Sequence, residues 1–183
     1  MWVMFVSVGG FMIKQEDAKA ILALGAEQLF PIEGIAQAVN VASTTIRNWI
    51  NRGHLELLQT RLFGKGSKAL FAYYDVIQIV AMAELSHLGI DPKQSGRLVV
   101  HIQSLISHQI RSYAGEWGDP TNYVDFKRYA YIFYNYELDK LEIAVVTEDI
   151  DREYPTVQDI SIIALDCLEL AKKSVYILLN MKR

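Results

Sequence analysis

The chain contains 183 residues, of which 51% are hydrophobic and 21% are charged. This length suits one large domain or two small ones, and the hydrophobic content excludes a wholly disordered chain. The single cysteine, Cys167, excludes an internal disulfide and fits a reducing compartment. We expect this cysteine to be a small buried hydrophobic side chain.

The net charge of −3 argues by itself against a nucleic-acid partner, but the charges are unevenly distributed. Residues 30–112 carry a net charge of +3, whereas residues 1–29 carry −1 and residues 113–183 carry −5. The stretch from Arg47 to Lys68 holds five basic side chains and one acidic side chain. A local positive surface of this kind is compatible with DNA binding.

The first thirteen residues, MWVMFVSVGGFMI, are apolar and uncharged. They are too short to span a bilayer, and they lack the basic region of a signal peptide. We expect an extra strand, a disordered tail, or an upstream start that precedes a natural Met12. No other segment of the sequence qualifies as transmembrane, so we expect no membrane partner and a cytoplasmic protein.

Three helices are predicted next. Alanines and spaced Ile and Leu residues favour a helix over 15–29. Pro31 can open a second helix whose apolar stripe ends at Val39, and Asn40 tolerates the left-handed conformation that stops a helix. A third helix then begins near Ser43 and ends at Gly53. Two helices separated by three residues form a helix-turn-helix layout.

The rest of the chain predicts a strand pair, two long helices, a hairpin and a final helix. In chain order, these elements are expected at 57–63 with 68–71, at 74–88, at 92–113, at 129–146 and at 157–179. The loop at 115–122, GEWGDPTN, marks the expected domain boundary.

The helix expected at 43–52 has an apolar face and a polar face. Ile46, Trp49 and Ile50 lie three and four residues apart, so they share one side and pack inward. The outer side carries Thr44, Arg47, Asn48 and Asn51. Arginine donates through a fork that suits guanine or phosphate, and asparagine can pair bidentately with adenine. A solvated amphipathic helix would fit this face alone equally well.

Residues 32–106 resemble the MerR-type winged helix-turn-helix domain. The resemblance runs through IEGIAQAVNVASTTIRNWINRGHL, a strand pair with a glycine-bearing wing, and LFAYYDVIQIVAMAELSHLGIDPKQSGRLV. The family has a Gly-Val turn, a recognition helix ending in Arg-Gly-Leu, a wing ending in Arg-x-Tyr, and an Asp that opens the next helix. The matching positions are Val41, Ile46, Arg47, Arg52, Gly53, Phe71, Asp75, Leu85, Gly89 and Ile90.

Several positions depart from the family pattern. Asn40 replaces the turn glycine, and Thr44 replaces a basic residue early in the recognition helix. Ala69 replaces the wing arginine, so a phosphate contact is lost or passed to Lys65 or Lys68. These departures leave room for related winged-helix proteins such as phage excisionases and the small subunits of viral terminases.

The resemblance implies a sequence-specific DNA-binding transcriptional regulator whose recognition helix enters the major groove. The residues expected to contact DNA are Ser43, Thr44, Arg47, Asn48, Asn51, Arg52, Arg61, Lys65 and Lys68. A homodimer is expected, because one such module offers few base contacts. The candidate dimer seam on the helix at 92–113 is Leu98, Ile102, Leu105 and Ile106, and the C-terminal hairpin and helix are the alternative.

We therefore predict a mainly α protein with an α+β C-terminal part, in which a winged helix-turn-helix is followed by a β-hairpin and a long helix. The expected units are an N-terminal extension and helix at 1–29 and the winged helix-turn-helix at 30–112. A third unit at 113–183 is expected to serve dimerisation, the sensing of a small-molecule effector or the binding of a protein partner.

Other candidate sites are weaker. His101 and His108 could bind a metal with Cys167, but two histidines seven residues apart cannot chelate one ion by themselves, so no metal or cofactor is expected. Four tyrosines could line a small-molecule pocket, although a packed sheet is favoured: Tyr129, Tyr131, Tyr134 and Tyr136.

An acidic run is most simply a solvated loop. Its residues are Glu148, Asp149, Asp151 and Glu153.

The sequence contains no phosphate loop, dinucleotide fingerprint or nucleophile elbow, so an enzyme is not expected. Two alternatives to a regulator stay open. One is a protein-interaction module on a winged-helix scaffold that has lost DNA contact, which Ala69 and the acidic last third favour. The other is a phage architectural DNA-binding protein for excision or packaging.

Overall fold

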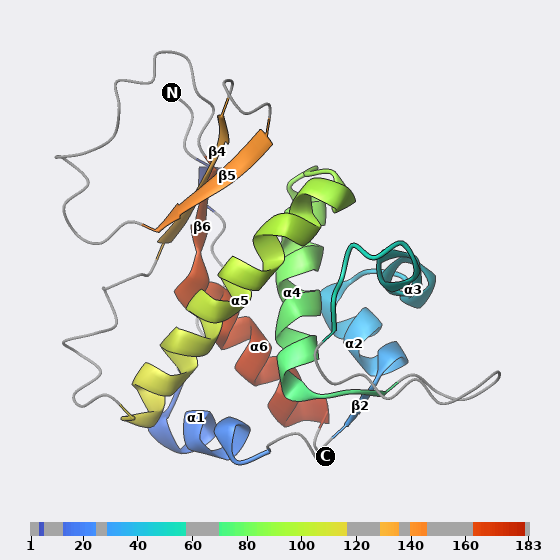
Figure 1. Cartoon of the computed structure of the whole chain (residues 1–183). Helices are drawn as coiled ribbons and strands as arrows, with labels where there is room; N and C mark the ends of the chain where they lie inside the picture. Colours follow the sequence, from blue (N-terminus) through green and yellow to red (C-terminus); the bar gives the residue numbers. More distant parts are fainter. Residues whose placement is uncertain are drawn as a thin grey trace, which may run out of the picture.

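The computed structural model has a mainly helical body and two small sheets in the part of the chain that it describes (Figure 1). The described residues are 4–5, 13–24, 29–57, 70–116, 129–135, 140–145 and 163–181. The helices are α1 (Gln15–Leu22), α2 (Ile32–Val39), α3 (Ser43–Asn51), α4 (Tyr73–His87), α5 (Pro92–Ala114) and α6 (Cys167–Met181). The strands are β1 (Met4–Phe5), β2 (Phe30–Pro31), β3 (Leu70–Phe71), β4 (Tyr129–Asn135), β5 (Lys140–Val145) and β6 (Ile163–Asp166).

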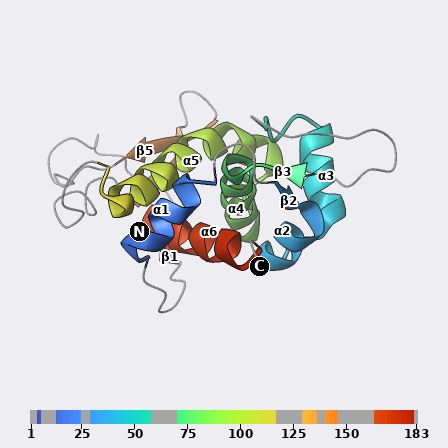
Figure 2. The ribbon, with the colours of Figure 1, turned by 90° about the horizontal axis from the view of Figure 1, so that it is seen from below.

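Helix α4 lies in the middle of the helical body, with α5 and α6 on opposite sides of it and α2 and α3 to its right in the view of Figure 2. Its sequence, YYDVIQIVAMAELSH, is apolar on nearly every face, and each residue from Val76 to Leu85 is buried. A helix that is hydrophobic all round is stable only where other elements cover it. The surrounding helices therefore pack around α4.

Local sequence sets the ends of the two long helices. Asp75 accepts a hydrogen bond from the backbone N–H of Ala72 at 3.2 Å, which caps the start of α4. Gly89 has a φ of 78° just beyond α4, a conformation that glycine adopts without a steric penalty. Asp91 then accepts from the N–H of Lys93 at 2.9 Å and caps α5. Both helices are confirmed to within one residue of their predicted bounds.

The larger sheet has the strand order β1-β6-β4-β5. Strand β4 is antiparallel to both β5 and β6, and β1 runs parallel to β6. The predicted C-terminal hairpin is therefore confirmed as β4 and β5. Of the three alternatives for the first thirteen residues, the extra strand is found at residues 4–5, paired with a strand from the far end of the chain.

The prediction of one helix from Val157 to Leu179 is wrong for residues 163–166, which form β6. Asp166 marks the change, because its Oδ1 accepts from the N–H of Leu168 at 3.0 Å and caps α6. Residues 157–162 lie outside the described residues. The short apolar run IALD suits a buried strand or a buried helix, and its pairing with β4 selects the strand.

The first helix is shorter than predicted. Helix α1 ends at Leu22, and Leu29, the expected last residue, has no regular structure and directly precedes β2. Residues 25–28 lie outside the described residues. The alanines favour a helix over the whole stretch, but Gly25, three residues after Leu22, is a stop signal that the prediction did not use.

The predicted wing is described only at its ends. Strand β3 pairs with β2 in an antiparallel register that joins Phe30 to Phe71. The returning chain is thus paired with the residues that precede the helix-turn-helix. Leu57 has no strand conformation, and residues 58–69, which include the predicted turn, lie outside the described residues.

One hydrophobic core contains side chains from all three segments that the sequence analysis separates. Helix α6 packs against α4, α5 and α1. The predicted dimer seam on α5 is wrong, because Leu98, Ile102, Leu105 and Ile106 are at most 6% exposed and belong to this core. None of the helices that the structure describes combines the length and apolar character needed to cross a membrane.

An ion pair between α4 and α6 should contribute to this packing. Lys173 Nζ lies 2.9 Å from Glu84 Oε2, and the two side chains are only 20% and 7% exposed. In Lys173→Met, the Glu84 carboxylate stays in the core without its cation. We expect the free energy of unfolding to fall by about 1–3 kcal/mol in urea denaturation.

The control for this variant is Lys14→Met. Lys14 lies 3.9 Å from Glu16, and the two side chains are 71% and 77% exposed. Solvent screens such a pair, so the change should be below about 0.5 kcal/mol. If the free energy of unfolding fell equally in the two variants, burial of the Lys173–Glu84 pair would not contribute to stability.

Candidate nucleic-acid interface

The turn between α2 and α3 has the predicted geometry. Asn40 has a φ of 56°, and it is the one non-glycine residue with positive φ in the described part of the chain. The N–H of Val41 donates to the carbonyl of Ala36 at 3.0 Å, which closes the end of α2. Asparagine tolerates this conformation, so it can replace a turn glycine. Helix α3 then begins at Ser43, three residues after Asn40.

The inner face of α3 is anchored by an indole. Trp49 is 3% exposed and Ile46 is fully buried, whereas Ile50 and Val41 are partly buried and packed against the core. The predicted orientation of the helix is therefore confirmed, with its apolar side toward α2 and the core. Burial of a large aromatic ring supplies much of the energy that holds so short a helix in place.

The outer face of α3 is polar and open to solvent. The exposed residues are Thr44, Arg47, Asn48, Asn51 and Arg52, and Ser43 is half-buried. The structure brings five of these predicted residues together on α3, and the sixth, Arg52, directly follows the end of the helix. The other three predicted contacts, Arg61, Lys65 and Lys68, lie outside the described residues.

Arg47 has a partner that the sequence analysis missed. Its Nη2 lies 3.3 Å from Oε1 of Glu33, near the start of α2, and both side chains are about half exposed. An exposed pair of this kind is weak, so the guanidinium can exchange its partner for a base or a phosphate. The fourteen-residue separation hides the pair from any local pattern, because it depends on how α2 and α3 cross.

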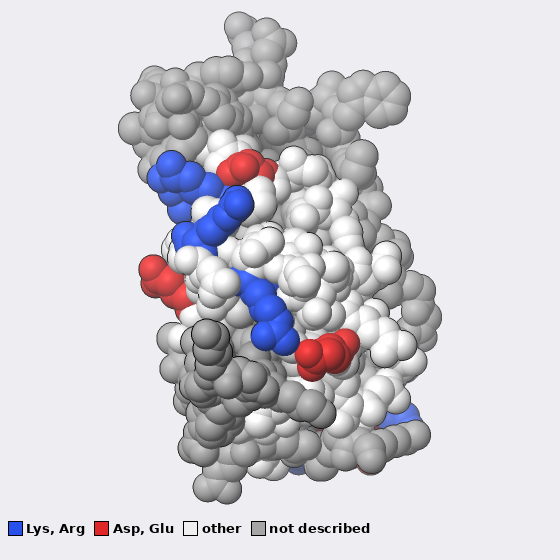
Figure 3. Space-filling view, turned by 90° about the vertical axis from the view of Figure 1, so that its right-hand side faces the viewer, with Lys and Arg blue, Asp and Glu red and all other residues white. Residues whose placement is uncertain are grey.

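Lys and Arg side chains form a row across the face that carries α3, with acidic side chains beside it (Figure 3). The exposed cations near this face include Arg47 and Arg52 of α3 and Lys93 and Arg97 of α5. The last two were not among the predicted contacts. They lie on a helix distant in sequence, next to the segment that leaves α3.

Helix α5 approaches the end of α3 very closely at Gly96. A Cβ at this position would lie 2.3 Å from the carbonyl oxygen of His54. The N–H of His54 in turn donates to the carbonyl of Trp49 at 2.8 Å. The segment that follows α3 is therefore held against α5 through backbone atoms, and only glycine fits at position 96.

The weaker candidate sites gain no support. Among the described residues, no three His, Cys, Asp or Glu side chains are grouped to hold a metal ion. His101 is exposed, His108 is half-buried and Cys167 is fully buried. Burial, followed by the charge of Asp166, raises the pKa of the Cys167 thiol to about 12. The tyrosine side chains of β4, together with Tyr136 and the acids at 148–153, lie outside the described residues.

No protein-family model matches the chain, and no curated protein matches it. The assignment of this face therefore depends on its own chemistry.

The close approach at Gly96 leads to a test of packing. In Gly96→Ala, the added methyl group meets backbone, which cannot move aside as a flexible side chain can. We expect the free energy of unfolding to fall by about 1–3 kcal/mol, in spite of the higher helix propensity of alanine.

The matched control is Gly34→Ala in α2, where the atom nearest to an added methyl group is Met181 Sδ, at 3.2 Å, on a flexible side chain. This variant should be neutral or more stable by up to about 1 kcal/mol. Chemical denaturation of both variants gives the comparison. A Gly96→Ala protein as stable as Gly34→Ala would contradict the contact with His54.

The thiol of Cys167 should be unreactive in the folded protein. Because the thiolate is the reactive form and the pKa is about 12, a disulfide reagent at about pH 8 should label the folded chain very slowly and the urea-unfolded chain fully. As the pH rises from the ordinary pKa of 9.0 toward 12, only the unfolded chain loses this proton, so stability should fall. Cys167→Val should abolish that part of the pH dependence.

Proposed function

We propose that this protein binds double-stranded DNA through the outer face of α3, as a sequence-specific transcriptional regulator of the MerR-like winged helix-turn-helix type. The observation that carries the proposal is the burial of Trp49, which turns the short polar side chains of α3 outward. A slim polar helix of this kind fits the major groove of B-DNA.

The proposed contacts divide by chemistry. Arg47 leaves Glu33 and donates to a guanine or a phosphate, while Asn48 and Asn51 pair with base edges. Ser43 and Thr44 lie at the start of α3, where Ala42 provides no side-chain cap, so their backbone N–H groups can donate to a phosphate, whereas the N–H of Thr45 already donates to the carbonyl of Ala42 at 2.9 Å. The remaining predicted cations hold phosphates: Arg52, Arg61, Lys65 and Lys68.

We propose a homodimer, because a single α3 reads only a few base pairs and two half-sites multiply affinity. The apolar face of α5 is already used within the chain, so the C-terminal part is the remaining candidate for the contact between subunits. A role of residues 113–183 in sensing or in binding a protein partner belongs to the same proposal, as does a cytoplasmic location.

The test is a binding selection on random DNA followed by affinity measurements at several salt concentrations. Arg47→Ala should cost about 1–3 kcal/mol at its preferred base and should relax the selected sequence there. Arg52→Ala should weaken binding to all sequences equally and should reduce the slope of log affinity against log salt by about one. Lys14→Ala, directly before α1, is the control and should change neither quantity.

The ion pair adds a third variant. Glu33→Gln removes the competitor of Arg47, so DNA affinity should rise, by up to about tenfold. DNA binding that does not depend on salt, or a selection without any preferred sequence, would contradict the proposal and would favour a protein-interaction module.

A further inference from the structure

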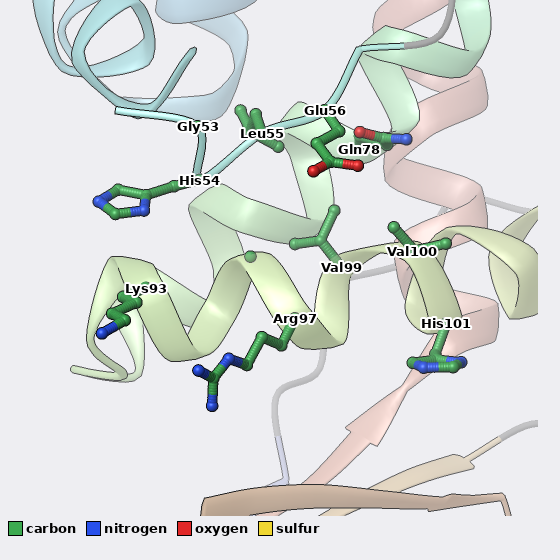
Figure 4. A pocket seen from close by; sticks show the side chains of 11 residues that line it. Gly53, His54, Leu55, Glu56, Gln78, Lys93, Arg97, Val99, Val100 and His101 are labelled. Carbon is green, nitrogen blue, oxygen red and sulfur yellow. The ribbon is translucent and has the colours of Figure 1, made fainter. Parts of the chain in front are cut away.

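A hollow of about 440 Å³ lies beside the proposed DNA-binding helix and has no role in the contacts described above. It is bounded by the segment Gly53–Glu56, by Gln78 of α4 and by the first half of α5 (Figure 4). This volume is in the range of small-molecule sites and is much larger than a single inorganic ion needs.

The inner end of the hollow holds a buried hydrogen-bond acceptor without a partner. Gln78 is 1% exposed, and its Nε2 donates to Oε1 of Gln103 at 3.3 Å. The Oε1 atom of Gln78 is buried and makes no hydrogen bond. Buried polar atoms in proteins are nearly always paired, so this oxygen is available to a donor. Glu56 lines the same hollow and adds a carboxylate, which also accepts.

The outer edge of the hollow is cationic. Lys93, Arg97 and His101 recur every four residues along α5, so they lie on one side of this helix. All three are exposed, and Figure 4 shows their side chains away from the end that holds Gln78. No ion pair involves Lys93 or Arg97 in the described part of the chain, so both charges can meet an anion.

The wall between the two ends is apolar. Leu55 and Val99 line it but are almost fully buried, so the apolar side chain most open to a ligand is that of Val100, which is 52% exposed. A ligand that suits the hollow therefore has N–H donors at one end, a flat or apolar middle and an anionic group at the other end. A nucleoside monophosphate combines these three features.

We propose that this hollow binds a nucleoside monophosphate. The N–H groups of the base donate to Gln78 and Glu56, the base and ribose cover the apolar wall, and the phosphate meets Lys93 and Arg97. Arginine and lysine are the usual phosphate ligands in proteins.

The position of the hollow also suggests a regulatory role, and this part rests on the proposed DNA-binding function. The segment Gly53–Glu56 continues directly from α3, and Gly96 on the opposite wall lies against the carbonyl of His54. A molecule that contacts both walls adds to the backbone contact that already holds the end of α3 against α5. Occupancy should therefore change the affinity for DNA.

The binding test uses the full chain without DNA. Isothermal titration with AMP, GMP, CMP and UMP should give one-site binding for at least one nucleotide, with a Kd of about 1 mM or lower. Inorganic phosphate and the corresponding nucleoside, which each satisfy only one end, should bind at least about tenfold more weakly. No binding by any of the four nucleotides, or equal binding by phosphate alone, would overturn the proposal.

Two variants assign the ends of the site. Arg97→Ala, on the surface, should weaken nucleotide binding about tenfold without weakening the nucleoside, and Gln78→Met should weaken both. Lys19→Ala removes an exposed cation of α1 and is the control for charge. If Arg97→Ala bound the nucleotide as tightly as the unaltered chain, the phosphate assignment would be wrong, and this result does not depend on whether Gln78→Met folds.

The regulatory part is measured separately. DNA affinity with and without a saturating nucleotide should differ by about fivefold or more, and Arg97→Ala should remove the difference. Equal affinities would refute the regulation and leave the nucleotide site intact. If the chain binds no DNA at all, the proposed function and its regulation fail together, whereas the titrations still decide the nucleotide site.

Discussion

Burial of α4 on every side is the constraint on which the rest of the structure depends. No residue between Val76 and Leu85 reaches solvent appreciably, so α2, α5 and α6 must each cover one part of the helix. This requirement joins segments from both halves of the chain in one core. It also explains why the apolar face of α5 is unavailable to a second subunit, since that face is needed to cover α4 and α6.

Helix α3 is short, and its position is set from three directions. Asn40 directs the chain into it, Trp49 anchors its inner side, and the turn after it rests on α5 at Gly96. Because the helix itself contributes little cooperative stability, these outside contacts fix the direction of its polar face. A disturbance at α5 is therefore transmitted to the surface that we propose for DNA.

Two kinds of site share this arrangement. The outer face of α3 is rich in exposed, short polar side chains, and the proposed contact with base edges depends on them. The hollow behind its end is concave, with a buried amide at one end and cations at the other, which suits a small molecule. The hollow is lined by the residues that follow α3, so its wall continues directly from the helix that carries the proposed DNA-binding face.

Local residue patterns were sufficient for the helix-turn-helix, for α4 and α5, for the C-terminal hairpin and for the inward direction of Trp49. These features follow from hydrophobic periodicity and from capping residues such as Asn40 and Asp91, which act over a few positions. Four features could not be predicted from local patterns. They are the strand β6, the ion pair between Glu33 and Arg47, the contact at Gly96 and the hollow around Gln78. Each joins residues distant in sequence, so it exists only through packing, and an apolar run such as IALD takes its conformation from the strand it meets.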